Sequence, residues 1–100
     1  MDARPEPRTF LVERYWPEID EDHARALATR LAETARAMSA DGIAVTHLES
    51  ILMPRDRVVF SLIAATDEAS ARQLTARADA PADRIALAIR LTEDDPWTGG

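Results

Sequence analysis

The sequence predicts an α+β domain whose secondary-structure elements follow the order βαββαβ. Two stretches repeat apolar residues at spacings of three and four, as amphipathic helices do. Four other stretches are rich in aliphatic, β-branched and aromatic residues and are bounded by proline, glycine or aspartate. This order is the split βαβ pattern, for which right-handed crossovers predict a four-stranded antiparallel sheet of strand order 4-1-3-2. Both helices are then expected on one face of the sheet.

The first strand and the first helix are predicted in the N-terminal half of the chain. The stretch RTFLVERY, residues 8–15, is predicted to be a strand that ends at Trp16 and Pro17. Asp20 is a good N-cap for the helix that follows, and Gly42 is its expected C-terminal stop. The apolar stripe of this helix consists of Ala24, Leu27, Leu31, Ala35 and Met38.

A β-hairpin is predicted next. Residues 43–53 and 58–65 are its two strands, and the proline and aspartate in residues 54–57 indicate the turn between them. The stretch VVFSLIAA, residues 58–65, is apolar on both alternating faces, which is typical of an interior strand.

A second helix and a fourth strand complete the domain. Either Thr66 or Asp67 is expected to cap the helix, and Pro81 is expected to end it. Residues 84–91, RIALAIRL, alternate regularly, with Ile85, Leu87, Ile89 and Leu91 on one face.

Length and composition indicate one small domain without disulfides. The chain has 100 residues and no cysteine, which also excludes thiolate nucleophiles and cysteine metal sites. We expect a flexible lead-in at residues 1–8, the domain at residues 9–92 and an acidic tail at residues 93–100. No stretch approaches the length of a membrane span, so a soluble cytoplasmic protein is expected.

The charge pattern argues against nucleic-acid and anionic membrane partners. The formal net charge is −6, and the basic residues are scattered rather than gathered in a stripe. Neutralisation of phosphates by clustered basic side chains supplies most nucleic-acid affinity, so a different kind of partner is expected.

One face of the predicted sheet has no helix to cover it. Residues 58–65 present apolar side chains on both faces, and alanines occupy the second face of residues 84–91. A monomer would then expose a large apolar patch. We therefore expect a homodimer of the dimeric α+β barrel type, with two sheets packed face to face. The alternative is that the terminal segments, with Trp97, fold back over this face.

Polar residues interrupt the apolar pattern of residues 43–53. If the turn is centred at residues 55–56, His47 lies opposite Ala64, and Ser50 lies opposite Ser61. His47 and Glu49 then share a face, with their Cα atoms about 6–7 Å apart, and Ile43, Val45, Ile51 and Met53 lie on that face as well. A half-buried imidazole there can bind a metal or move a proton. The alternatives are a structural histidine, or charges that protect an edge strand.

Two further positions are candidate sites. Glu13 interrupts a central strand, where burial of a carboxylate requires a partner such as Arg14, Arg84 or a cation, and Tyr15 shares its face. The first turn of the first helix places His23 beside two carboxylates, Glu21 and Asp22, which could form a weak surface metal site. The alternative is that these acids only stabilise the helix N-terminus. The sequence contains no Gly-rich phosphate loop, HExxH motif or nucleophile elbow.

Several stretches together resemble a known family. FLVERYWP, DEDHARALATRLAE, GIAVTHLESILMPRDRVVFSLIAA and ARADAPADRIALAI are similar to small bacterial ferredoxin-like proteins, mostly catalogued as a domain of unknown function, with a nickel-responsive or nickel-binding label. The resemblance covers residues 9–91. It implies a ferredoxin-like fold, a homodimer and binding of a divalent metal. His47 and Glu13 are the matching positions with suitable donor atoms.

Three functions follow from these observations. The first is a homodimer that binds a divalent metal, with nickel favoured, through His47 or His23 and carboxylates. The second is a small-molecule binder or cofactor-independent enzyme with Glu13, Tyr15, His47 and Glu49 in a pocket between sheet and helices. The third is an interaction module in which these residues are structural. No organic cofactor is implied, and binding is expected over catalysis.

Overall fold

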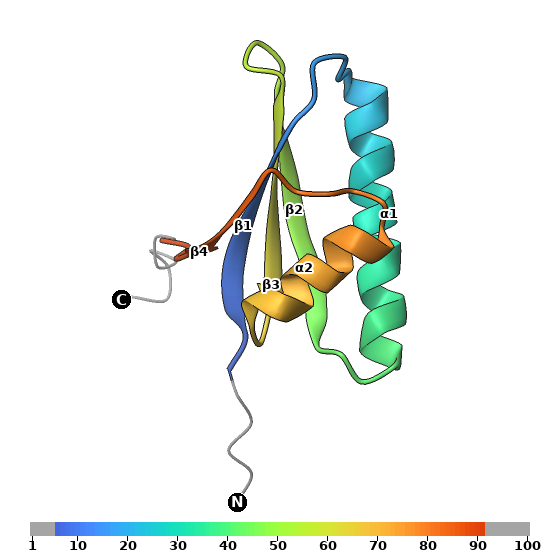
Figure 1. Cartoon of the computed structure of the whole chain (residues 1–100), viewed down its shortest axis with the longest axis vertical. Helices are drawn as coiled ribbons and strands as arrows, with labels where there is room; N and C mark the ends of the chain where they lie inside the picture. Colours follow the sequence, from blue (N-terminus) through green and yellow to red (C-terminus); the bar gives the residue numbers. More distant parts are fainter. Residues whose placement is uncertain (1–5, 92–100) are drawn as a thin grey trace, which may run out of the picture.

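The computed structural model describes residues 6–91 and contains the predicted βαββαβ order. Figure 1 shows the six elements, in chain order β1 (Arg8–Tyr15), α1 (Glu21–Ala40), β2 (Val45–Met53), β3 (Val58–Ala65), α2 (Glu68–Arg77) and β4 (Arg84–Ala88). Within these residues, no helix is long and apolar enough to cross a membrane.

The sheet has the predicted topology. Its four strands are antiparallel in the order β2-β3-β1-β4, which is the expected order 4-1-3-2 read from the other edge. Both helices lie on the same face of the sheet (Figure 1). The sequence prediction of a ferredoxin-like α+β fold is therefore confirmed.

The helix ends follow from local hydrogen bonding. The Asp20 carboxylate accepts the backbone N–H of His23 at 2.8 Å, and Asp67 accepts the backbone N–H of Ser70 at the same distance. Asp67 rather than Thr66 is therefore the cap of α2. After α1, Gly42 has a φ of 91°, a conformation that costs glycine little.

The end of α2 differs from the prediction that Pro81 stops it. The helix ends at Arg77, and Ala78 is the C-cap. Asp79 then has a φ of 54°, so the chain has already left the helical conformation before the proline.

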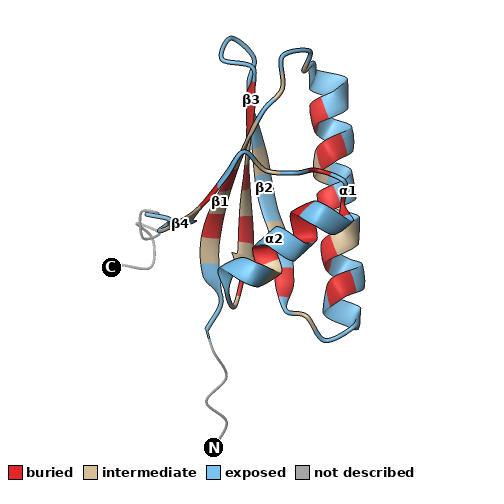
Figure 2. Cartoon of the chain, in the orientation of Figure 1, coloured by how far each residue is buried: buried red, intermediate tan, exposed pale blue. Residues whose placement is uncertain are grey.

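The hydrophobic core fills the layer between the helices and the sheet. Figure 2 shows the buried stripe of α1 facing the sheet, and its five residues are those predicted from the spacing. The most completely buried large side chains come from both helices and from β3, and they are Leu27, Met38, Val59, Ile63 and Leu74. Six of the other eleven residues of the core cluster are alanine, which contributes little buried apolar area per residue.

Two predicted strands are shorter in the structure. β2 begins at Val45 rather than at residue 43, and β4 ends at Ala88 rather than at residue 91. β4 pairs with β1 up to the pair Thr9–Ala88, one residue from the start of β1, so little of β1 remains to pair with later residues. Ile89 and Leu91 are accordingly 80% and 91% exposed instead of belonging to an apolar strand face.

The second face of the sheet carries no helix and is called here the bare face. Its central part consists of half-buried side chains that alternate with the core residues, namely Leu11, Phe60, Leu62 and Ala64. Tyr15, Ile51 and Met53 lie together at the end of this face next to the β2–β3 turn and are 60%, 45% and 41% exposed. The expected apolar patch is therefore present. The expected tail at residues 93–100 lies outside the described residues.

We expect Ile63→Ala to lower the free energy of unfolding by about 2–5 kcal/mol, because its side chain is fully buried and truncation leaves a cavity. Urea unfolding of the full chain measures this loss. Thr29→Ala, on the exposed side of α1, should change it by less than about 0.5 kcal/mol. Equal losses for the two variants would contradict the central position of Ile63.

Candidate functional site

A β-bulge in β2 determines where His47 lies. From the hairpin turn, β2 pairs with β3 in the predicted register as far as Glu49, which is opposite Leu62. The register then shifts, and His47 is opposite Ile63 instead of Ala64. One extra residue, Leu48, is left outside the regular pairing.

The bulge corrects the predicted faces of β2. Because an extra residue reverses the alternation of side chains, His47 and Glu49 do not share a face. His47 lies on the helix-covered face with Val45, which is 3% exposed, whereas Ile51 and Met53 lie on the bare face with Glu49. The prediction that placed all of these residues on one face is therefore wrong.

His47 belongs to a chain of three hydrogen-bonded side chains, called here the hydroxyl chain. His47 Nε2 lies 2.8 Å from Ser50 Oγ, and Ser50 Oγ lies 2.7 Å from Ser61 Oγ. Ser61 is 3% exposed on the central strand β3, so its hydroxyl requires a partner inside the protein. The predicted pairing of Ser50 with Ser61 is confirmed.

The protonation of His47 depends on its surroundings. Burial lowers the pKa of the His47 imidazole below its usual value, and the nearby Glu49 carboxylate partly opposes this effect by favouring the charged form. His47 is therefore a neutral imidazole at pH 7, which is the form that binds metals.

An open groove lies beside His47, between α1 and the edge strand β2. Its volume is about 510 Å³, and the residues that line it are Ala32, Ala35, Arg36, Ser39, Ala40, Val45, Thr46 and His47. The small side chains of α1 leave this space above β2. His47 is thus half-buried, but one side of the groove gives it access to solvent.

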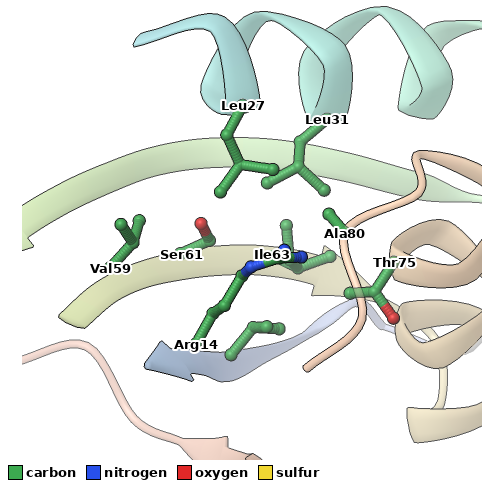
Figure 3. A pocket seen from close by; sticks show the side chains of 9 residues that line it. Arg14, Leu27, Leu31, Val59, Ser61, Ile63, Thr75 and Ala80 are labelled. Atoms are coloured by element: carbon green, nitrogen blue, oxygen red, sulfur yellow. The ribbon is translucent and has the colours of Figure 1, made fainter. Parts of the chain in front are cut away.

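The interior beside Ser61 is nearly filled. A small cavity of about 10 Å³ is lined by Ser61, Arg14, Thr75 and large apolar residues such as Leu27 (Figure 3). Figure 3 shows the side chains of Leu27 and Leu31 reaching from α1 toward the strand that carries Ser61. This volume is at the lower limit for a single water molecule and is too small for an organic ligand.

Glu13 lies on the opposite face from His47. Arg84 Nη1 donates to Glu13 Oε2 at 3.1 Å, and the Glu13 side chain is 12% exposed. Of the two arginines expected as partners, Arg84 makes the pair. Arg14 instead donates to the carbonyl oxygen of Pro81 and lies 5.0 Å from the centre of the Trp16 ring.

The remaining predicted residues are dispersed. Tyr15 and Glu49 lie on the bare face with Glu13, so the structure does not bring these three together with His47. His23 is at the N-terminus of α1, where its Nδ1 lies 2.7 Å from Asp20 Oδ1. Glu21, expected beside His23, pairs with Arg25 at 2.7 Å.

The donor set of one chain is incomplete for a metal ion. Within residues 6–91, no group of three or more histidine, aspartate or glutamate side chains is placed to hold one. His47 fits a divalent metal as a single imidazole ligand, and Glu13 does not reach the same site.

Sequence reasoning did not identify Ser61 or the bulge as parts of the site. Ser61 is the polar residue in an otherwise apolar run, and a buried hydroxyl in a central strand needs a partner. That need was a signal for the hydroxyl chain. The bulge has no comparable signal, because residues 45–53 also fit a regular strand.

We expect His47→Gln to weaken the decline in the free energy of unfolding that accompanies a fall in pH below 6.5. The folded-state pKa of His47 is lowered from 6.5, so its neutral form stabilises the fold fully above that pH. This contribution is lost as the pH falls from 6.5 through the folded-state pKa, because the unfolded chain takes up the proton first. Urea unfolding on both sides of pH 6.5 measures the slope, which Thr29→Ala should retain. An unchanged slope in His47→Gln would contradict the burial of the imidazole.

Comparison with known proteins identifies the family. Residues 10–87 match the family described as "Nickel responsive protein SCO4226-like". Neither the comparison with curated proteins nor the comparison with solved structures gave a match. The matched region runs from β1 into β4 and includes His47, Ser50 and Ser61. This chain is therefore a member of the SCO4226-like nickel responsive protein family.

Proposed function

We propose that this protein binds a divalent nickel ion and that His47 is its imidazole ligand. The observation that carries this proposal is the half-buried, neutral His47 ring at the edge of an open groove. Membership of a nickel responsive family supports nickel as the metal. Imidazole nitrogen is also a favourable ligand for Ni(II).

The hydrogen bonds of His47 suit a role as a metal ligand. Its Nε2 is engaged by Ser50, and its Nδ1 has no hydrogen-bond partner within residues 6–91. Metal-bound histidines usually form a hydrogen bond through their second ring nitrogen, which fixes the ring orientation. We therefore assign Nδ1 as the metal-binding atom and Ser50 as the group that orients the ring.

His47 supplies only one ligand, so the other ligands of nickel must come from groups other than Glu13 and His23. Glu13 is on the other face of the sheet and already pairs with Arg84, so we do not include it in the site. His23 is in contact with Asp20 at the end of α1, and we treat it as a helix-end residue. Water molecules would complete the coordination of nickel at His47.

We also propose that two copies associate through their bare faces. Tyr15, Ile51 and Met53 are large side chains exposed together at one end of that face, next to its half-buried centre. Burying them against a second sheet would remove this patch from water. The cytoplasmic location expected from the sequence stays a prediction.

A role as a small-molecule enzyme has less support. The small cavity between sheet and helices holds about 10 Å³, so it does not accommodate a substrate. Glu13, Tyr15 and Glu49 do not line a common pocket with His47. Binding at the open groove therefore agrees better with the geometry than catalysis in a closed pocket.

We expect His47→Ala to weaken binding of Ni(II) by at least about tenfold, since loss of a ligand should cost no less than loss of its supporting partner. Calorimetric titration of metal-free protein, purified without a histidine tag, measures the affinity. His23→Ala is the matched control and should bind like the unmodified protein. Loss of binding in His23→Ala alone would move the site to the helix terminus, and absence of binding in the unmodified chain would refute the proposal.

We expect Ile51→Glu to convert the dimer to a monomer, because a carboxylate buried within an apolar interface must lose its hydration. Light scattering coupled to size-exclusion chromatography gives the molar mass. Thr29→Glu, on the exposed side of α1, adds the same charge and should leave the dimer intact. A monomeric unmodified protein would contradict the proposed association.

A further inference from the structure

An ion pair joins the chain beyond β4 to the opposite edge of the sheet. Arg90 Nη2 lies 3.6 Å from Glu49 Oε1, and the two side chains are 45% and 49% exposed. Arg90 follows β4, which ends at Ala88, whereas Glu49 belongs to β2. Because β2 and β4 are the two edge strands, this contact connects the two sides of the bare face.

The width of the sheet shows how far the chain must cross to make this contact. One row of directly opposite residues runs across the bare face from β2 to β4, and it consists of Glu49, Leu62, Leu11 and Ala86. Three strand spacings, about 14 Å, separate the ends of this row. The chain beyond Ala88 must therefore turn back over the bare face to bring Arg90 to Glu49. Figure 1 shows this part of the chain on the side of the sheet away from α1.

The segment that turns back, residues 89–91, is held only weakly on its own chain. Ile89 and Leu91 are 80% and 91% exposed, so the segment buries little apolar surface where it lies. The ion pair of Arg90 is itself about half exposed, and ion pairs of this kind add little stability. Moving the segment away from its own sheet therefore costs the protein little.

The same segment obstructs the association of two bare faces. Two packed sheets lie about 10 Å apart, a space that the side chains of the two facing sheets fill. A backbone segment that crosses one of these faces prevents such contact. Residues 89–91 must consequently move before a second sheet can pack on the bare face.

We propose that two copies of the chain exchange this ion pair when their bare faces associate, so that Arg90 of each copy pairs with Glu49 of the other. A two-fold axis that brings the β4 edge of each copy to the β2 edge of the other allows this exchange. The sheet separation of about 10 Å is then shorter than the roughly 14 Å that Arg90 must cross on its own sheet.

The exchange retains both ion pairs of the two separate chains. In a two-fold dimer each contact occurs twice, so two pairs within chains are replaced by two pairs between chains. The centre of the bare face, with Leu11 and Leu62, is then free to meet the second sheet. This inference deepens the proposed association through the bare faces and rests on it.

Two charge reversals in the full-length chain test the exchange. Arg90→Glu places acids at both positions of the pair, and Glu49→Arg places bases at both. Either variant alone lacks a matched pair, whether pairing occurs within one chain or between two. In an equimolar mixture of the two variants, only pairing between copies joins an acid to a base. Both positions are about half exposed, so neither reversal should prevent folding.

Native mass spectrometry of the mixture counts mixed and self-paired dimers, since the two variants differ in mass. We expect the ratio of mixed to self-paired dimers to exceed the ratio for random pairing by about fivefold, because two matched pairs form in each mixed dimer. The matched controls are Arg25→Glu and Glu21→Arg, which reverse a pair within α1. Their mixture changes the charges equally and should give the random ratio.

The outcomes separate the exchange from the association itself. A random ratio for Arg90→Glu mixed with Glu49→Arg, or the absence of dimers in that mixture while the unmodified chain dimerises, would overturn the exchange and leave the proposed association standing. An excess of mixed dimers in the control mixture as well would attribute the effect to net charge and would also overturn the exchange. A monomeric unmodified chain would refute the proposed association, and the exchange with it.

Discussion

The extra residue in β2 is the feature on which the arrangement of the site depends. With regular pairing throughout β2, His47 would lie on the bare face beside Glu49 and opposite Ala64. The bulge at Leu48 reverses the alternation, so the imidazole lies on the helix-covered face and reaches Ser50. Its burial, its lowered pKa and its place at the groove all follow from that reversal.

The small residues of α1 leave the space beside the bulge that His47 lines. Large side chains at positions 27 and 31 pack over the middle of the sheet, whereas Ala28 and Ala32 face the edge strand β2. A bulky residue at position 32 would fill the groove beside His47, and one at position 28 would fill the groove beside Ser50. The same alanines limit the apolar area that the domain buries, so the space beside His47 is obtained at some loss of core stability.

Most of the fold was predictable from sequence, because helix caps, apolar spacing and turn residues are local signals. Asp20, Asp67 and Gly42 have the roles that their side chains or conformational freedom suggest. The register of the hairpin was also predictable, but only between the turn and Glu49. Further from the turn, the pairing of β2 with β3 depends on whether β2 accommodates an extra residue. That depends on the fit of β2 beneath α1, which is a tertiary property that the residues of one strand do not encode.

The candidate site was predictable in its central residue but not in its composition. His47 interrupts an apolar row, which made it a candidate. The structure gives it the hydroxyl of Ser50, itself bonded to Ser61, as a partner instead of the carboxylates expected. Glu13 also interrupts an apolar row, and its partner is Arg84 on the neighbouring strand. His47 and Glu13 thus give similar signals in the sequence but have different partners in the structure. The partner of each residue depends on strand order and register.

The ion pair between Glu13 and Arg84 has a consequence for any two sheets that pack through their bare faces. Glu13 is in the middle of an apolar surface, and Arg84 remains 67% exposed at the edge of the sheet. A partner sheet placed directly over this pair would strip water from both charges, whereas one displaced toward β2 and β3 would leave Arg84 hydrated. In a dimer of that kind, the pair would therefore disfavour alignments that bury the guanidinium and favour those that keep Arg84 at the rim of the interface.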